Sequence, residues 1–247
     1  MYLLDDITVR NPQEENKIIS VLQKSGAAVI PGYLERAQIE KLIGEFHFCL
    51  SSAKNNFVTP FDYSEGSGCV VANDKIDKSI LPETFKVFNS SFMKSLALKY
   101  LGGYYALNSV IYFVKDVVGS KHLANDLHFD VNRAFKFFIY LNDASVKNGA
   151  FACVPGSHLR ALEIREKLGN KINFDNRELT RELPYTDKDA QAMEGKAGTL
   201  IIFDTNVFHR AGNVSEGERW VMRGHTYITA EKNKASNVFS KIKSLFK

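Results

Sequence analysis

Two histidines and an aspartate have the types and the spacing of a metal site. His128 and Asp130 are two residues apart, so in an extended segment both side chains point to the same side. His209 lies 81 residues further on and can reach the same ion if the chain folds back on itself. Two imidazoles and one carboxylate on one face of an octahedral ion leave three positions open, as in non-heme Fe(II) oxygenases. Taken alone, such a motif is more often a buried histidine beside a turn aspartate. The surrounding residues must therefore decide between a metal site and this structural role.

The surroundings of this motif contain further short motifs in a fixed order. They are Leu127–Asp130, Leu141–Asp143, Asn148–Gly149, Val154–His158, Gly198–Phe203, His209–Asn213 and Arg219. In order and spacing the sequence resembles the phytanoyl-CoA dioxygenase family of Fe(II)- and 2-oxoglutarate-dependent oxygenases, over about residues 20–228. The resemblance implies a mainly β fold, a double-stranded β-helix or cupin-like jelly roll, with the metal ligands near one end. It also implies Fe(II) held by His128, Asp130 and His209, with 2-oxoglutarate and O₂ as co-substrates.

The far carboxylate of 2-oxoglutarate needs a cationic partner. An arginine suits it, because the planar guanidinium makes two parallel hydrogen bonds to a carboxylate. Arg219, ten residues past His209, stands where the resemblance places this anchor. Arg223 lies four residues further on and on the same face of an extended strand, so it is the rival. Phe138 matches a bulky aromatic position beside the co-substrate, although an ordinary core role explains it equally well.

The remaining histidines are less informative than these three ligands. We expect His158 to support the metal ligands from behind or to stabilise a turn, and His225 to line the barrel as a satisfied core histidine. His47 and His122 are expected to be structural or exposed. In halogenating relatives of the family a small residue replaces the carboxylate ligand, so the presence of Asp130 disfavours halogenation.

Helices are predicted near the start of the chain. Asn11 and Pro12 have the pattern of a helix start, with asparagine at the cap and proline at the first helical position. A short buried strand over 27–30 and a second amphipathic helix over about 35–50 follow. We therefore expect a helical layer over about residues 11–50 that flanks the barrel.

Short β-rich runs, separated by turn residues, dominate the chain after about residue 57. They are Val110–Val114, Phe135–Leu141, Ala150–Val154, Thr199–Phe203 and Trp220–Ile228. The dipeptide Asn148–Gly149 is a strong hairpin signal. We expect one oxygenase domain over residues 1–247, with its jelly-roll core at about 105–228.

Three segments stand outside the predicted strands. Residues 159–196 are rich in both charges and indicate a surface insert with some helix. The aromatic and glycine-rich segment Asn56–Asp77 is either a mobile lid over the substrate or a passive connector. Residues 230–247 have the pattern of a basic amphipathic helix, which can pack on its own barrel or a second subunit, or lie on an anionic membrane surface. We favour packing, because most such helices cover a core.

Composition argues against several classes of protein. The net charge of +4 is carried by the tail after residue 229, so the body lacks the basic face of a nucleic-acid binder. No apolar run approaches the roughly 20 residues of a membrane-spanning helix, and the N-terminus does not look like a secretory signal. The three widely spaced cysteines indicate reduced thiols, so we expect a cytoplasmic protein.

The sequence favours an enzyme over a binding protein. The predicted activity is a 2-oxoglutarate-dependent dioxygenase that hydroxylates an aliphatic C–H bond of a small or conjugated organic substrate. Two alternatives stay open: a non-catalytic metal-binding jelly roll, and a hydrolase using Zn²⁺ at the same three ligands. Arg219 argues against the hydrolase, since hydrolysis needs no carboxylate anchor. No motif identifies the substrate or the choice among hydroxylation, desaturation, epimerisation and ring closure, and a homo-oligomer stays open.

Overall fold

Two antiparallel sheets make up most of the structure, a computed structural model that describes residues 2–51, 57–102, 105–121, 123–168 and 185–228. The larger sheet has seven strands in the order β1-β8-β5-β10-β4-β3-β2. These are β1 (Ala27–Ile30), β2 (Val58–Tyr63), β3 (Gly66–Ala72), β4 (Tyr105–Val117), β5 (Ala134–Tyr140), β8 (Leu200–Asp204) and β10 (Glu218–Ile228). The smaller sheet consists of β6 (Ala152–Val154), β7 (Gln191–Ala192) and β9 (Phe208–Arg210), in the order β7-β6-β9.

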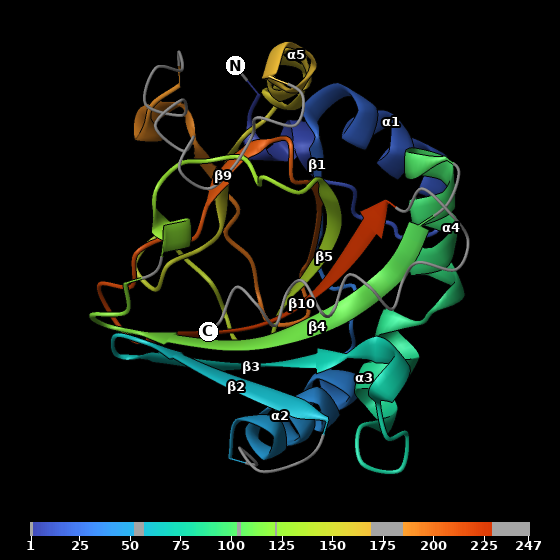
Figure 1. Ribbon diagram of the computed structural model, residues 1–247, viewed down its shortest axis with the longest axis vertical. Coiled ribbons are helices and arrows are strands. Elements are labelled where there is room, and N and C mark those ends of the chain that lie inside the picture. The colour runs from blue at the N-terminus through green and yellow to red at the C-terminus, as the bar shows by residue number, and fades with distance from the viewer. Residues whose placement is uncertain (1, 52–56, 103–104, 122, 169–184, 229–247) are drawn as a thin grey trace.

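The longer helices cover the outer side of the larger sheet. They are α1 (Glu15–Ser25), α2 (Arg36–Ser51), α3 (Pro82–Phe88) and α4 (Ser91–Leu101), and α5 (His158–Leu168) lies near β9 and the smaller sheet. Figure 1 shows the larger sheet curving around an interior that the smaller sheet closes from the other side. The predicted mainly β, cupin-like jelly roll with flanking N-terminal helices is therefore confirmed.

The central strand β5 is apolar along its whole length because both of its faces are covered. All seven of its residues are buried. Phe135, Phe137 and Ile139 belong to the cluster that packs under the helices, whereas Phe138 and Tyr140 face the barrel interior. A strand buried on both faces reads as a continuous apolar run. The one charged residue in this run, Lys136, therefore stands out.

Two local predictions are wrong. Helix α1 begins at Glu15 and not at Pro12, because the side-chain oxygen of Asn11 accepts a hydrogen bond from the backbone N–H of Gln13 (3.0 Å). Such an Asx turn competes with the helix for the same backbone groups. Asn148–Gly149 forms a turn, with Gly149 at φ 84°, but the strands before and after it belong to different sheets. The turn therefore carries the chain from one sheet to the other and closes no hairpin.

The segment Asn56–Asp77, predicted as a lid or connector, contains a β-hairpin. Strands β2 and β3 pair with each other, and β3 extends the larger sheet from β4. Gly66 and Gly68 lie opposite Tyr63 and Phe61 in the hairpin. A Cβ at these glycines would lie 2.4 and 2.5 Å from the two rings, so the rings cross over the glycines. The mixture of glycine and aromatic residues is therefore a cross-strand packing pattern.

The insert and the tail are described only in part. Helix α5 and strand β7 lie within the charged insert predicted at 159–196, and its residues 169–184 lie outside the described residues. The tail at 230–247, predicted as an amphipathic helix, lies outside them as well. In the part of the chain that the structure describes, no helix is both long enough and apolar enough to cross a membrane.

A pair of glycine substitutions tests the junction that leads into β1. Gly26 and Gly32 both have positive φ, of 75° and 63°. A Cβ at Gly26 would lie 2.8 Å from the ring of His158, whereas no atom lies within 4 Å of a Cβ at Gly32. We expect Gly32→Ala to lower the free energy of unfolding by about 1 kcal/mol, and Gly26→Ala by at least about 2 kcal/mol. Urea unfolding measures both values, and equal losses would contradict the described packing of His158.

Candidate metal centre

Backbone pairing brings the two halves of the predicted ligand set together. His128 and His209 form an antiparallel bridge, with N–H to O distances of 3.0 and 2.7 Å. The backbone N–H of Asp130 donates to the carbonyl of Thr205, at 3.0 Å. His128 and Asp130 lie in an extended connection before β5, outside the regular strands. The extended backbone still directs both side chains to His209.

The three predicted ligands converge on one point. The Oδ1 atom of Asp130 lies 3.4 Å from Nε2 of His128 and 3.5 Å from Nε2 of His209. The ligand atoms of all three residues lie within 4.8 Å of one another. Both histidines are about 95% buried, whereas 24% of the Asp130 side chain is exposed. Atoms bound to one ion at about 2.1 Å and at right angles would be about 3 Å apart, so the spacing fits a single metal ion.

Hydrogen bonds from the Nδ1 atoms fix the orientation of the two imidazole rings. Nδ1 of His128 donates to the carbonyl of Asp126 (2.6 Å), and Nδ1 of His209 donates to the carbonyl of Val207 (2.8 Å). A carbonyl oxygen can only accept, so each Nδ1 carries a proton, and in the neutral ring Nε2 is the nitrogen that offers a lone pair to a metal. Metal-binding histidines are commonly oriented by such a second hydrogen bond. The donor set therefore fits a divalent ion.

The protonation states also suit a metal site. Burial, followed by the neighbouring His128, lowers the pKa of His209 to about 4, so the imidazole is neutral near pH 7. Burial alone would raise the pKa of Asp130. The charge of Lys136, followed by the proximity of the two histidines, nevertheless lowers it well below its ordinary value. The carboxylate of Asp130 is thus ionised and the imidazole of His209 is neutral, as metal ligands must be.

Lys136 contacts the metal-site carboxylate and was missed at the sequence level. Its Nζ lies 2.6 Å from Oδ2 of Asp130, and 8% of its side chain is exposed. The other carboxylate oxygen, Oδ1, is the one that faces the histidines. A lysine within an otherwise apolar, fully buried strand was the available signal, because such a charge needs a partner.

Two further arginines tie the ligand-bearing segments together. Arg165 of α5 donates to the carbonyl oxygens of Asp130 and Val131, the latter at 2.7 Å, and to the side chain of Asn206 at 2.5 Å. Arg133 pairs with the buried Asp204 at 2.5 Å. Both contacts join the connection around Asp130 to the segment before His209. Arg165 belongs to the predicted surface insert, where sequence alone gave no sign of this contact.

Arg219, the predicted anchor, is already paired. It is 3% exposed, and its Nε and Nη2 lie 3.1 and 2.5 Å from Oδ2 of Asp116. Its Nη1 donates to the carbonyl of Gly149. A guanidinium has five N–H donors, so two remain beyond these three contacts.

Arg223, the rival, is placed differently. Its Nε is buried without a hydrogen-bond partner among the described residues, and its guanidinium lies 4.7 Å from the ring centre of Tyr112. Phe138 is its direct partner on β5 and is 5% exposed. The ring of Phe138 packs 5.4 Å from that of Phe151. Phe138 is therefore a core residue that also borders Arg223.

His225 departs from the expectation of a satisfied core histidine. It is 6% exposed, and its Nε2 has no partner among the described residues. Burial, then the charges of Lys136 and Arg223, lower its pKa well below the ordinary value, so it is neutral. His158 donates from Nε2 to the carbonyl of Gln23 in helix α1 at 3.2 Å, so it joins two distant segments and does not stabilise its own turn.

The last two histidines take no part in the described centre. His47 is exposed, with its ring 4.8 Å from that of Trp220. His122 lies outside the described residues.

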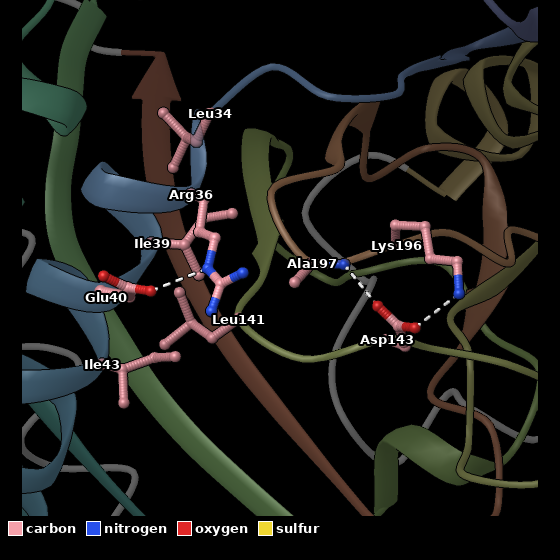
Figure 2. Close-up of a pocket in the computed structure, with 9 residues that line it drawn as sticks. All are labelled: Leu34, Arg36, Ile39, Glu40, Ile43, Leu141, Asp143, Lys196 and Ala197. Atoms are coloured by element: carbon pink, nitrogen blue, oxygen red, sulfur yellow. Dashed lines mark hydrogen bonds and ion pairs between the residues drawn. The ribbon is translucent and has the colours of Figure 1, made fainter.

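A surface depression of about 450 Å³ lies away from the metal centre, beside α2. It includes Leu141, which follows β5, whereas the metal ligands gather at the other end of that strand. Its charged side chains are paired, Arg36 with Glu40 and Lys196 with Asp143 (Figure 2). The depression supplies none of the ligands described above.

The family comparison supports the predicted resemblance. The model of the family described as phytanoyl-CoA dioxygenase (PhyH) matches residues 105–221, which include all three metal ligands. Among curated proteins, none gives a significant match. The resemblance to the PhyH family is thus confirmed.

Solved structures share the fold at low sequence identity. SnoK, a non-heme alpha ketoglutarate dependent carbocyclase from nogalamycin biosynthesis, is 17% identical with a TM-score of 0.63, covering 87% of this chain and 84% of SnoK. The epimerase SnoN in complex with Fe³⁺, alpha ketoglutarate and nogalamycin RO is 15% identical with a TM-score of 0.60, covering 88% and 85%. HygX from Streptomyces hygroscopicus, with nickel, 2-oxoglutarate and hygromycin B, is 13% identical with a TM-score of 0.56, covering 86% and 86%.

Removing any one ligand should abolish tight metal binding. We expect His128→Ala, Asp130→Ala and His209→Ala each to weaken Ni(II) binding by about 100-fold or more, because two ligands hold a divalent ion poorly. Calorimetric titration of the metal-free protein measures this. His47→Ala is the matched control, since this exposed histidine packs on Trp220 and should leave the affinity unchanged. Unchanged affinity in Asp130→Ala would exclude the assigned site.

Proposed function

We propose that this PhyH-like chain is an Fe(II)- and 2-oxoglutarate-dependent dioxygenase. The observation that carries the proposal is the convergence of His128, Asp130 and His209, with both Nε2 atoms facing one carboxylate oxygen. When bound, ferrous iron would supply the oxidative chemistry. The overall reaction consumes the substrate R–H, 2-oxoglutarate and O₂, and yields R–OH, succinate and CO₂.

The protein would hold the ion in a fixed and dry setting. The aromatic rings of Phe203 and Phe151 lie 5.0 and 5.7 Å from the ring of His209. Phe138 packs against both of them. This apolar packing keeps the inner side of the ligand set away from water, which strengthens the electrostatic interactions there. The exposed part of Asp130 marks the side from which the metal and substrate enter.

Two arginines on one face of β10 would serve the two carboxylates of 2-oxoglutarate. Arg219 is held rigidly by Asp116 and keeps two N–H donors for the far carboxylate. The Nε atom of Arg223 is buried without a hydrogen-bond partner among the described residues. Arg223 lies opposite Phe138 and two residues along β10 from His225, the residue opposite Lys136. We therefore keep Arg219 as the anchor and assign Arg223 to the carboxylate nearer the metal.

Hydroxylation is the outcome that we propose among those available to this chemistry. The presence of Asp130 leaves the carboxylate position filled, which disfavours a halide in its place. SnoN is an epimerase and SnoK a carbocyclase, so desaturation, epimerisation and ring closure are the competing outcomes. The small-molecule complexes of SnoN and HygX support a small or conjugated organic substrate for this chain.

Substrate-independent turnover tests the class of enzyme. The purified protein with Fe(II), ascorbate and O₂ should release succinate from 2-oxoglutarate, faster when the right metabolite is added. A screen of metabolite pools with succinate release as the signal would find that metabolite. Metal binding without any consumption of 2-oxoglutarate across the pools would favour a non-catalytic protein. Hydrolysis that depends on Zn²⁺ would favour the hydrolase.

Alanine substitutions separate the roles of the two arginines. Arg219→Ala should weaken 2-oxoglutarate binding by about 2–5 kcal/mol, since a desolvated carboxylate loses its partner. Arg223→Ala should weaken it less, because the metal also holds the nearer carboxylate. Titration of the Ni(II)-loaded protein with 2-oxoglutarate gives both values, and Arg210→Ala, whose partner Asp187 is exposed, is the control. The opposite ranking would move the anchor to Arg223.

A further inference from the structure

We propose that Lys136 restricts Asp130 to a single metal-facing oxygen and so keeps one position on the metal free. The inference rests on the proposed function, because it concerns how the same site handles a gaseous co-substrate. It makes Lys136 a positioning residue, which acts through Asp130 and does not touch the reacting atoms.

The two oxygens of the Asp130 carboxylate are divided between two kinds of partner. Oδ1 faces the Nε2 atoms of both histidines, at 3.4 and 3.5 Å. Oδ2 lies 2.6 Å from Nζ of Lys136. A carboxylate can bind a metal through one oxygen or through both. With Oδ2 held by an ammonium group, only Oδ1 is available to the ion.

The strand that carries Lys136 gives the contact its rigidity. β5 is paired on both sides, by β8 and β10, and every one of its residues is buried. The side chain of Lys136 is 8% exposed, with Nζ 5.7 Å from the centre of the Phe203 ring. Asp130 is the only carboxylate paired with it among the described residues. The ammonium group of Lys136 is therefore held beside Oδ2 of Asp130.

The number of oxygens through which Asp130 binds decides whether a coordination position stays open for O₂. An octahedral ion offers six positions, and three protein atoms leave three. A chelating 2-oxoglutarate takes two of these, so one remains for O₂. If both oxygens of Asp130 bound the ion, the protein would take four positions and 2-oxoglutarate the last two. The second carboxylate oxygen would then block the gas without displacing the metal.

A simpler role for Lys136 is to balance the buried charge of Asp130. The two roles predict different defects. If Lys136 only balances charge, its loss weakens metal binding and the fold together, because an unpaired buried carboxylate is destabilising. If Lys136 limits the carboxylate to one oxygen, its loss leaves the metal in place and removes the open position.

Nitric oxide is a suitable probe of the open position, because it binds ferrous iron without turnover. We expect Lys136→Met to bind Fe(II) and 2-oxoglutarate within about threefold of the unmodified protein, but nitric oxide at least about tenfold more weakly. The electron paramagnetic resonance signal of the iron–nitrosyl complex measures this. Lys136→Arg should restore nitric oxide binding, since a guanidinium also donates to Oδ2. Lys115→Met, which removes a lysine from β4, two strands away in the same sheet, and its contact with Glu218, is the matched control.

The outcomes distinguish this inference from the proposed function. If Lys136→Met lowers metal affinity, nitric oxide affinity and melting temperature together, Lys136 only balances the charge of Asp130, and the inference is overturned. Unchanged nitric oxide binding would overturn it as well. If the unmodified protein binds Fe(II) but not 2-oxoglutarate, the proposed function fails, and the inference fails with it. If the unmodified protein binds both and only the nitric oxide result is negative, the proposed function stands.

Discussion

The bridge between His128 and His209 is the interaction on which the centre depends. The two histidines are 81 residues apart in the chain, and their backbones exchange two hydrogen bonds of 3.0 and 2.7 Å. Because the pairing fixes the two backbones, it also fixes the directions in which the imidazoles leave them. Arg165 adds a contact between the same two segments, from a helix outside both sheets. The ligand geometry is thus set by backbone pairing before any metal is bound, which is how a site becomes pre-organised.

The barrel interior contains more basic than acidic groups once the ion pairs are counted. Two buried cations there each have a carboxylate: Lys136 with Asp130, and Arg219 with Asp116. Burying an unpaired charge is strongly unfavourable, so these pairings explain why the interior tolerates ionised groups. Arg223 and the neutral His225 are left with nitrogen atoms that no described residue satisfies. An interior of this kind is better suited to an anionic co-substrate than to a neutral one.

The sequence predicted the parts of the structure that local pattern controls. The apolar runs of β5 and β8 and the spacing of His128 and Asp130 follow from alternation and burial, which a single sequence displays. Arg165 was missed because its partners lie 34 to 41 residues away in the sequence. Lys136 was missed although Asp130 is only six residues away, because a charge within an apolar run does not identify its partner. The hairpin at 58–72 was missed because its glycines read as loop residues until the opposing rings are known.

The same hairpin connects the outer edge of the sheet to the proposed anchor. The hydroxyl of Tyr63 donates to Oδ1 of Asp116 at 2.5 Å, and the other oxygen of Asp116 accepts two hydrogen bonds from Arg219. The guanidinium is therefore fixed directly by Asp116 of β4 and by the turn at Gly149, and Tyr63 of β2 in turn fixes Asp116. An arginine that is already ordered loses little side-chain freedom when a ligand carboxylate arrives. The ion pair that occupies Arg219 thus also orients it, so pairing within the protein and binding of a co-substrate need not exclude each other.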